Sequence, residues 1–386
     1  FISSIFLLYL VFYLFFRSRL SLGKYFLKNK YNKIEKGYLH FVDAMIAVAN
    51  KDNKTALKSH KKMVSYLKDD QSLSLLLKAE VLKIEKKFPE LNNIYEDMIK
   101  SKKTETLGYR GLMEQNLRNQ DYHHAFLYGE KLFSINPNIE KLYDTLIFIA
   151  AKTKNWNQIV LLSDKAFSHK IISKNDLNEN KSVGFYEIAK IKYDSDIKDS
   201  LKNILKALDL KKNFPPYVKL HLEIIAGLND KRNLKKLIKK YWSLNPSSLL
   251  RSIIIKILND NDLTEIKFIN EIIKNNAGEE ESKKLLIYFA IKNLKWDIAR
   301  ENIIGMIGSS PSRDICYFMS DIELGENNDK QKSDAWIMRA ENAKLENCWI
   351  CRITNQSQEE WSSLSNSGNY NSLVWSSPMM IRQNSN

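Results

Sequence analysis

Apolar residues along most of this chain recur with the period of an α-helix, in pairs of segments joined by short polar turns, and the alternation typical of β-strands is nearly absent. A small or apolar residue marks the same place in the second helix of each pair. Eight positions share this feature, at intervals of 32 to 41 residues: Ala56, Leu91, Ala125, Ile159, Ser200, Leu234, Ile266 and Ala299. A period of this length predicts stacked two-helix modules.

Two further signals accompany the period. Three residues before the marker, four of the modules carry an aromatic residue: Phe88, Tyr122, Trp156 and Trp296. Twelve residues after it, three modules carry proline, which ends a helix because it lacks the amide hydrogen: Pro137, Pro246 and Pro311. These features resemble the tetratricopeptide repeat. They predict an all-α fold, a tetratricopeptide-like right-handed α-solenoid in which each module covers the apolar face of the next.

The N-terminal segment differs from the repeats. Residues 1–16 are apolar except for Ser3 and Ser4, and a bilayer span takes about 20 such residues. We expect a transmembrane helix at residues 1–20 that continues upstream of the given sequence, followed by a basic juxtamembrane helix at residues 21–36. The rival interpretation is a signal peptide, which would need a basic start and a small-residue cleavage site.

Basic residues follow this segment closely, and short basic flanks favour the cytoplasmic side of a membrane. The predicted membrane-surface residues are Arg17, Arg19, Lys24, Lys28 and Lys30. They would contact anionic lipid headgroups, although a generic stop-transfer flank explains them equally well. We therefore expect the large repeat domain on the cytoplasmic side of the membrane.

The repeat array is expected at residues 37–343 and a short Trp-rich tail at residues 344–386, disordered from about Met380. One interval, between Ile159 and Ser200, is longer than the others. We place its extra residues in a polar loop at residues 168–180, either a binding insertion or, as we favour, a longer turn between modules.

Composition narrows the function classes. The net charge is +15, but the lysines fall on the polar faces of amphipathic helices rather than in one stripe, so no nucleic-acid partner is predicted. Cys348 and Cys351 form a single CxxC pair, and a structural zinc needs four ligands. We find no phosphate-binding loop, metalloprotease motif or nucleophile elbow. The sequence therefore predicts a protein that is not an enzyme and holds no metal or cofactor.

A groove remains as the candidate site. In tetratricopeptide arrays the first helix of each pair lines the concave face. The register places seven side chains there, with charges of both signs around one aromatic: Arg110, Glu114, Arg118, Lys141, Asp144, Phe148 and Lys152. Such a set suits an extended or helical segment of a partner protein. The alternative is that these are ordinary solvated helix residues.

The chain as a whole resembles the HemY family, bacterial inner-membrane tetratricopeptide proteins associated with haem biosynthesis. The N-terminal resemblance runs from Phe15-Phe16-Arg17 through Lys36-Gly37-Tyr38 to residues 47–56. The C-terminal resemblance, to the alphaproteobacterial branch, covers residues 334–340, 349–351, 360–362 and 368–375.

Some relatives carry paired cysteines in the tail. Thr354, Ser365 and Ser367 stand where further thiols would be expected. The resemblance therefore implies that this chain closes no four-thiolate site, and that its tail is held by tryptophans or is loose.

The resemblance implies a non-catalytic factor near the membrane-associated steps of tetrapyrrole synthesis. Our hypothesis is a membrane-anchored scaffold whose partners are proteins, haem-pathway enzymes among them, and membrane lipid. One alternative is an anchored adaptor for envelope assembly or regulated proteolysis. Another is direct handling of a tetrapyrrole or a metal.

Overall fold

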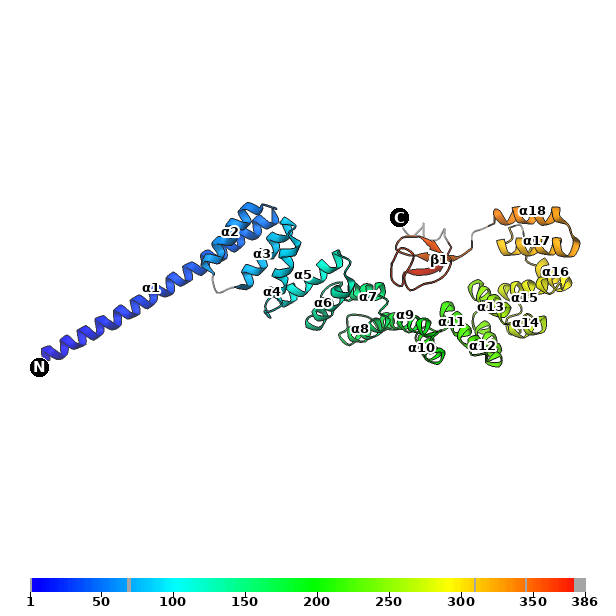
Figure 1. Ribbon diagram of the computed structural model, residues 1–386, viewed down its shortest axis with the longest axis horizontal. Helices are drawn as coiled ribbons and strands as arrows, with labels where there is room; N and C mark the ends of the chain where they lie inside the picture. Colours follow the sequence, from blue (N-terminus) through cyan, green and yellow to red (C-terminus); the bar gives the residue numbers. More distant parts are fainter. Residues whose placement is uncertain (1, 68–70, 309, 344–345, 378–386) are drawn as a thin grey trace. The chain divides into compact units, whose positions relative to one another are not determined.

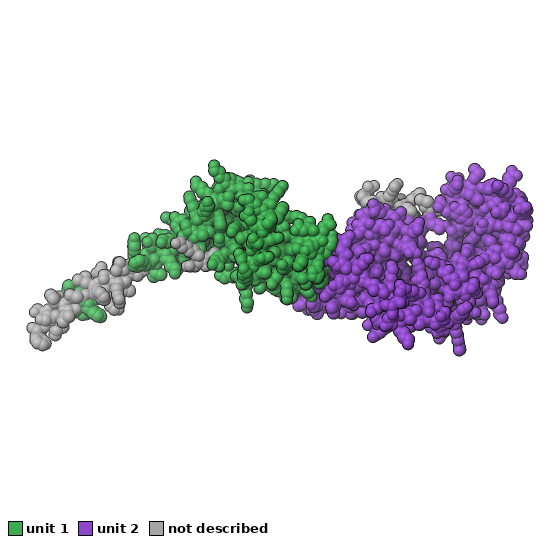
Figure 2. All heavy atoms as spheres, in the orientation of Figure 1, with its two compact units in different colours: residues 1–146 green, residues 147–386 purple. Residues whose placement is uncertain are grey.

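The structure is a computed structural model that describes residues 2–67, 71–308, 310–343 and 346–377, with only the backbone for parts of the first helix. Those residues form eighteen α-helices and three short strands (Figure 1). They divide into two compact units, residues 1–146 and 147–386 (Figure 2).

The first unit contains six helices and the start of a seventh, which continues into the second unit. The helices are α1 (Ile2–Ala49), α2 (Asn53–Tyr66), α3 (Gln71–Glu85), α4 (Phe88–Met98), α5 (Glu105–Arg118), α6 (Tyr122–Ile135) and α7 (Leu142–Lys152).

The second unit holds the other eleven helices: α8 (Trp156–Ser168), α9 (Lys174–Lys192), α10 (Ile197–Leu210), α11 (Pro215–Gly227), α12 (Lys231–Leu244), α13 (Ser248–Asp260), α14 (Ile266–Ile273), α15 (Glu280–Lys292), α16 (Trp296–Ile304), α17 (Arg313–Asn327) and α18 (Lys330–Glu341). Odd-numbered helices are the first members, and even-numbered helices the second members, of successive pairs. The described chain is thus a tetratricopeptide-like solenoid of helix pairs with a small sheet at its C-terminal end.

The predicted register is confirmed in seven of the eight modules. Each marker residue is the fourth residue of its even-numbered helix and is completely buried, as with Ala125 in α6 and Ser200 in α10. The four aromatic residues of the pattern are each the first residue of their helix, as Trp156 is in α8. The exception is Ile266, which begins α14 and is only partly buried. The fourth residue there is Ile269, which is completely buried. The prediction was wrong because the loop before α14 is longer than those of its neighbours.

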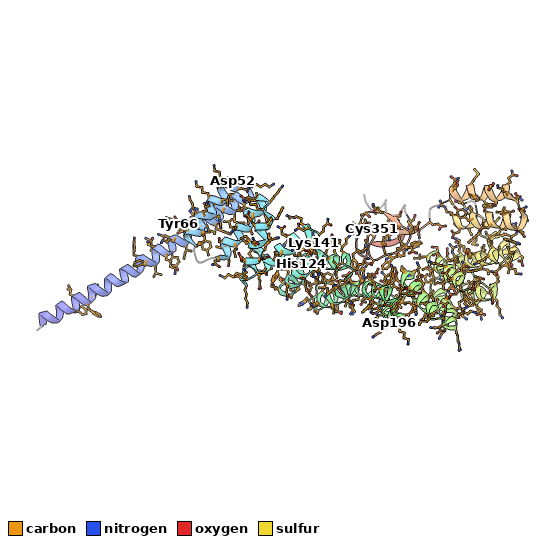
Figure 3. All side chains as sticks on the ribbon, in the orientation of Figure 1. Asp52, Tyr66, His124, Lys141, Asp196 and Cys351 are labelled. Carbon is orange, nitrogen blue, oxygen red and sulfur yellow. The ribbon has the colours of Figure 1, made fainter. Side chains whose placement is uncertain are left out.

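The turns inside the pairs repeat as well. In seven of them, a residue with φ between 49° and 59° precedes the N-cap: Lys51, Lys86, Gln120, Lys154, Asn229, Leu294 and Asn328. Five even-numbered helices have an aspartate N-cap whose side chain accepts a backbone hydrogen bond: Asp52, Asp121, Asp196, Asp230 and Asp329. A carboxylate there satisfies an otherwise unpaired amide and favours the helix dipole. Figure 3 labels Asp52 and Asp196 at the starts of α2 and α10.

The polar loop predicted at residues 168–180 is mostly helix. Helix α8 ends at Ser168, and α9 starts at Lys174 and runs for 19 residues. Ser173 caps α9, with its hydroxyl accepting from the Asp176 amide and the Asp176 carboxylate accepting from the Ser173 amide. This capping box lets a polar sequence start a helix, so most of the extra residues lengthen α9 instead of forming a loop.

The predicted membrane span lies in the first part of α1, except for Phe1, which is outside the described residues. Within the described part of the chain, no helix combines the length and the apolar character that crossing a bilayer requires. The structure therefore does not confirm a transmembrane helix at residues 1–20. The basic connector predicted at residues 21–36 is the middle of α1.

The tail forms a small antiparallel sheet that the sequence analysis did not anticipate. Its strands are β1 (Cys348–Cys351), β2 (Ser357–Gln358) and β3 (Leu373–Ser376), in the order β2-β1-β3. Trp349 lies opposite Trp375 and Gln358 in the register. We call residues 346–377 the C-terminal module. The segment expected to be disordered from about Met380 lies outside the described residues.

Candidate functional site

The seven predicted groove residues lie on or beside α5 and α7 and are split between the two units. Arg110 and Glu114 form an ion pair at 2.8 Å, with both side chains about half exposed. The Arg118 guanidinium lies 4.9 Å from the centre of the Phe88 ring, on α4. These contacts hold two of the predicted cations against neighbouring side chains in the first unit.

The other four residues belong to α7 and the turn before it. Lys141 has a φ of 61° and precedes the first residue of the helix, and its side chain is 80% exposed (labelled in Figure 3). Asp144 falls in the first turn of α7. In the second unit, the Lys152 ammonium is 5.6 Å from the centre of the Phe148 ring. A single groove formed by all seven residues remains a prediction.

A defined cavity lies elsewhere, in the second unit. Its volume is about 590 Å³, and it lies between α9, α11, α13 and the C-terminal module. The three helices are first members of successive pairs, which are the helices expected to line the groove. They lie further along the chain than α5 and α7, where the groove residues were predicted. Residues at helical spacing face it, such as Leu249, Ile253 and Lys256 on α13.

Aromatic side chains hold the C-terminal module against these helices. The Trp361 ring is 92% buried and packs edge-to-face on three rings, with centroid distances of 5.2 Å to Tyr186, 5.3 Å to Phe214 and 5.7 Å to Tyr217. Trp349 on β1 packs against Phe214 in the same way, at 6.0 Å. Such pairs contribute about 0.5–1.5 kcal/mol each beyond their buried area. Trp349 and Trp361 also line the cavity, so the module forms one of its walls.

The charges around the cavity have both signs. The Lys219 ammonium of α11 donates to the Glu360 carboxylate at 2.8 Å, and this contact lowers the pKa of Glu360. Burial raises the pKa of Glu223, which no ion pair among the described residues includes. Lys190 and Lys256 lie at the rim. A ligand would therefore meet an apolar floor, aromatic walls, one half-buried carboxylate and a rim that can orient charges of either sign.

The Tyr193 and Tyr186 hydroxyls add polar groups to the same wall. Tyr193 Oη donates to the Glu223 carbonyl oxygen at 3.4 Å. Burial raises the pKa of Tyr186, and the charges of nearby carboxylates raise it further. Both phenols are thus neutral near pH 7 and able to donate or accept a hydrogen bond.

The residues that stand where relatives would carry further cysteines lie around Cys351 (labelled in Figure 3). Ser372 Oγ is 3.2 Å and Ser367 Oγ 3.7 Å from Cys351 Sγ, while Thr354 and Ser365 contact Ser367 at 3.1 and 2.9 Å. Burial raises the pKa of Cys351, but hydrogen bonds from Ser372, Thr354 and two backbone amides outweigh it and lower the pKa to about 5.

One thiol and several neutral hydroxyls do not fit a zinc site, which needs four ligands of the Cys, His or carboxylate kind. In the described part of the chain, no group of three or more His, Cys, Asp or Glu side chains is close enough to hold a metal. The hydroxyl groups instead link the loops of the module by hydrogen bonds. The tail was expected either to be held by its tryptophans or to be loose, and in the structure tryptophan contacts hold it.

Sequence reasoning missed the cavity because the tail was expected to be irregular. Trp349, Trp361 and Trp375 were visible as a cluster, but nothing in the sequence states which helices they contact. The partner rings belong to α9 and α11, more than 130 residues earlier.

No family model matches the sequence, and no curated protein matches it. Among solved structures, the chain is similar to a chain of Naa15/Naa10 bound to HypK-THB, with 12% identity, a TM-score of 0.39, and coverage of 79% of this chain and 58% of that one.

It is also similar to a tetratricopeptide repeat protein from Parabacteroides merdae, with 13% identity, a TM-score of 0.31, and coverage of 65% and 93%. A third similar structure is the TPR2AB-domain complex of yeast Sti1, with 10% identity, a TM-score of 0.33, and coverage of 79% and 98%. These scores are below 0.5, so the fold assignment rests on the helix pairs of the chain itself.

Proposed function

We propose that this chain is a non-catalytic scaffold that binds a segment of a partner protein in the cavity between α9, α11, α13 and the C-terminal module. The observation that carries the proposal is the composition of that cavity: an apolar floor from Leu220 and Ile253, with Trp349 and Trp361 opposite. Aromatic residues around a concave apolar site are typical of the centres of protein interfaces.

The partner segment inserts one apolar or aromatic side chain between the tryptophans and the helices. Its backbone amides reach the Glu223 carboxylate, whose pKa is raised by burial. Charged residues beside the anchor are oriented by the lysines and carboxylates of the rim. This arrangement binds a short extended segment better than a flat protein surface, since the site is a cavity of about 590 Å³.

The test is selection of binding peptides from a random displayed library on the immobilised full chain. The enriched peptides should share an apolar or aromatic anchor. Leu249→Ser, in the cavity wall, should weaken their binding about tenfold or more, because the loss of a buried apolar contact costs about 1–3 kcal/mol.

Leu205→Ser on α10 is the matched control, because Leu205 is 43% exposed and does not line the cavity. It should leave binding unchanged. Peptides without a common anchor, or equal binding by the Leu249→Ser variant, would refute the cavity as the site.

The groove predicted from the sequence is tested on the same peptides. The test variant reverses the charges of four residues that do not line the cavity: Arg110, Arg118, Lys141 and Lys152. If the groove is the true site, this quadruple variant loses binding while Leu249→Ser retains it.

The resemblance to the HemY family motivates a finer proposal about partners and place. In it the partners are enzymes of haem synthesis, and the chain works at the cytoplasmic face of the bacterial inner membrane. The basic residues after the apolar run, Arg17 and Arg19 among them, support this location. Co-purification from membranes of the native host distinguishes haem-pathway enzymes from envelope-assembly factors or proteases, which would favour the adaptor alternative.

A further inference from the structure

A second cavity lies in the first unit and has a different character. Its volume is about 1040 Å³, and it is bounded by α1, the end of α2, the start of α3 and the turn after α4. Tyr66, which closes α2, marks it in Figure 3. The candidate partner-binding site described above shares no residue with it.

Helix α1 supplies one wall. Lys30, Lys33, Ile34 and Tyr38 line the cavity, and their spacing places them on one face of the helix. Helix α1 is held close to the end of α2 beside this face. A Cβ atom on Gly37 would lie 2.4 Å from Leu67 Cγ, which is closer than any real contact.

The turn after α4 supplies the opposite wall, with Asp97, Lys100, Ser101 and Lys103. Lys100 is neutralised by Asp97, whose carboxylate accepts from it at 2.7 Å. Lys103 has no such partner. In the described part of the chain, Lys30, Lys33 and Lys103 enter no ion pair, so three unpaired cations face one space from two directions.

The floor between the walls is polar. Gln71, Ser72 and Ser74 at the start of α3 line it. Ser74 Oγ is 3.2 Å from the His60 ring. Hydroxyl groups there can donate to an anion that the lysines attract.

The charge of the lining side chains indicates which class of ligand the cavity can bind. Among the described residues that line it, four lysines and one aspartate give a net charge of about +3, and like charges held together repel unless an anion neutralises them. Arginine, whose planar group matches a carboxylate with two hydrogen bonds, is not among the lining residues. Lysine is a point charge that suits the oxygens of a phosphoryl group.

We propose that this cavity binds a ligand that carries a phosphoryl group, with Lys33 and Lys103 contacting the group from opposite walls. The volume exceeds that of a phosphate alone and matches the upper range of small-molecule sites. The phosphoryl group comes either from a soluble phosphate ester or from a phospholipid headgroup. Lys30, which the sequence analysis assigned to the membrane surface, lies at the same cavity.

The experiment uses the purified full chain and two probes. Inorganic pyrophosphate is titrated by calorimetry, and co-sedimentation is measured with vesicles of phosphatidylcholine alone or mixed with phosphatidylglycerol. The test variant is Lys33→Glu/Lys103→Glu. The control is Lys36→Glu/Lys102→Glu, which makes the same charge change on the same two segments at exposed residues outside the cavity lining.

We expect saturable binding of at least one probe by the unaltered chain. The test variant should bind about tenfold or more weakly, because each charge-assisted contact contributes about 1.5–3 kcal/mol. The control should bind within about twofold of the unaltered chain, and circular dichroism should show equal helix content in all three proteins. Pyrophosphate binding identifies a soluble ester as the source. Binding only to vesicles that contain phosphatidylglycerol identifies a headgroup.

Equal losses in the test and control variants would show a non-specific effect of charge and would overturn the proposal. So would the absence of saturable binding to either probe.

Discussion

Replacing Trp361 by alanine is the most direct test of how the C-terminal module is held. The side chain is 92% buried between α9, α11 and the module, with three ring contacts between 5.2 and 5.7 Å. Truncation of a buried tryptophan costs about 3–5 kcal/mol. The contacts join the module to the helices, so we expect this loss to lower the free energy of undocking rather than the stability of the helical array.

Hydrogen exchange measures that difference at the amides of β1. Exchange there requires the module to open, and opening is a local event with its own free energy. A loss of about 3 kcal/mol or more should speed the exchange of Ile350 and Cys351 by a factor of about 100 or more. Hydrogen exchange in α11 and α13 should change far less, because side chains other than Trp361 also hold these two helices together.

The matched control is Trp336→Ala on α18. Trp336 is partly buried, packs against the α15–α17 core and lies under the Arg339 guanidinium at 5.0 Å. It is not part of the apolar cluster that contains Trp349 and Trp361, so β1 exchange should be unchanged. If Trp361→Ala left β1 as protected as before, or if both variants sped exchange equally, the aromatic cluster would not be what holds the module.

Three further predictions concern pH, packing and turns. His221 is 95% buried, and burial lowers its pKa to about 4. Between pH 6.5 and 4 the unfolded chain therefore takes up a proton that the folded chain does not. In denaturant unfolding, the free energy of unfolding of the parent should fall by about 3 kcal/mol relative to that of His221→Gln as the pH falls from 7 to 4. Equal pH dependence of the two proteins would contradict this. Gly108→Ala would place a Cβ atom 2.8 Å from the Tyr95 carbonyl oxygen, so it should cost about 1–3 kcal/mol in thermal unfolding, whereas Gly278→Ala, with no atom within 4 Å, should be nearly neutral. Leu294 has a φ of 56° and is 69% exposed, so Leu294→Asn should raise the free energy of unfolding by about 0.5–1 kcal/mol. A lower melting temperature would show that contacts of the leucine side chain outweigh the strain of its backbone.

The sequence predicted the repeated helix pairs well because the period depends only on contacts between helices that are neighbours along the chain. A completely buried small or apolar residue at the fourth position of each second helix, as at Ala125, needs only its own helix and the one before it. The same local logic failed at Ile266, since spacing alone cannot detect a longer loop. It also failed at residues 168–180, where the capping box at Ser173 starts a helix in a sequence that composition marks as polar loop.

The candidate site could not be predicted in the same way, because it depends on contacts between distant segments. The tail tryptophans could be identified, but their docking on Tyr186 and Tyr217 depends on how the helix pairs from α9 to α18 stack. The lysines of the second cavity show the same limit. Lys33 and Lys103 read as ordinary exposed residues of their own segments, and only the fold brings them to one space.

The C-terminal module also explains why docking and ligand binding should be linked. A segment of this size cannot bury enough apolar surface to fold alone, and the hydroxyls around Cys351 do not replace a metal as a staple. Its buried residues, Trp349, Cys351 and Trp361 among them, belong to the same apolar cluster as α9 to α15. The array thus supplies the core that the module lacks. A ligand that contacts Trp349 and Trp361 binds only the docked state, so by mass action it must stabilise docking by an amount that grows with its concentration above Kd. Peptides that bind the cavity should therefore slow hydrogen exchange in β1, and peptides that bind elsewhere on the array should not.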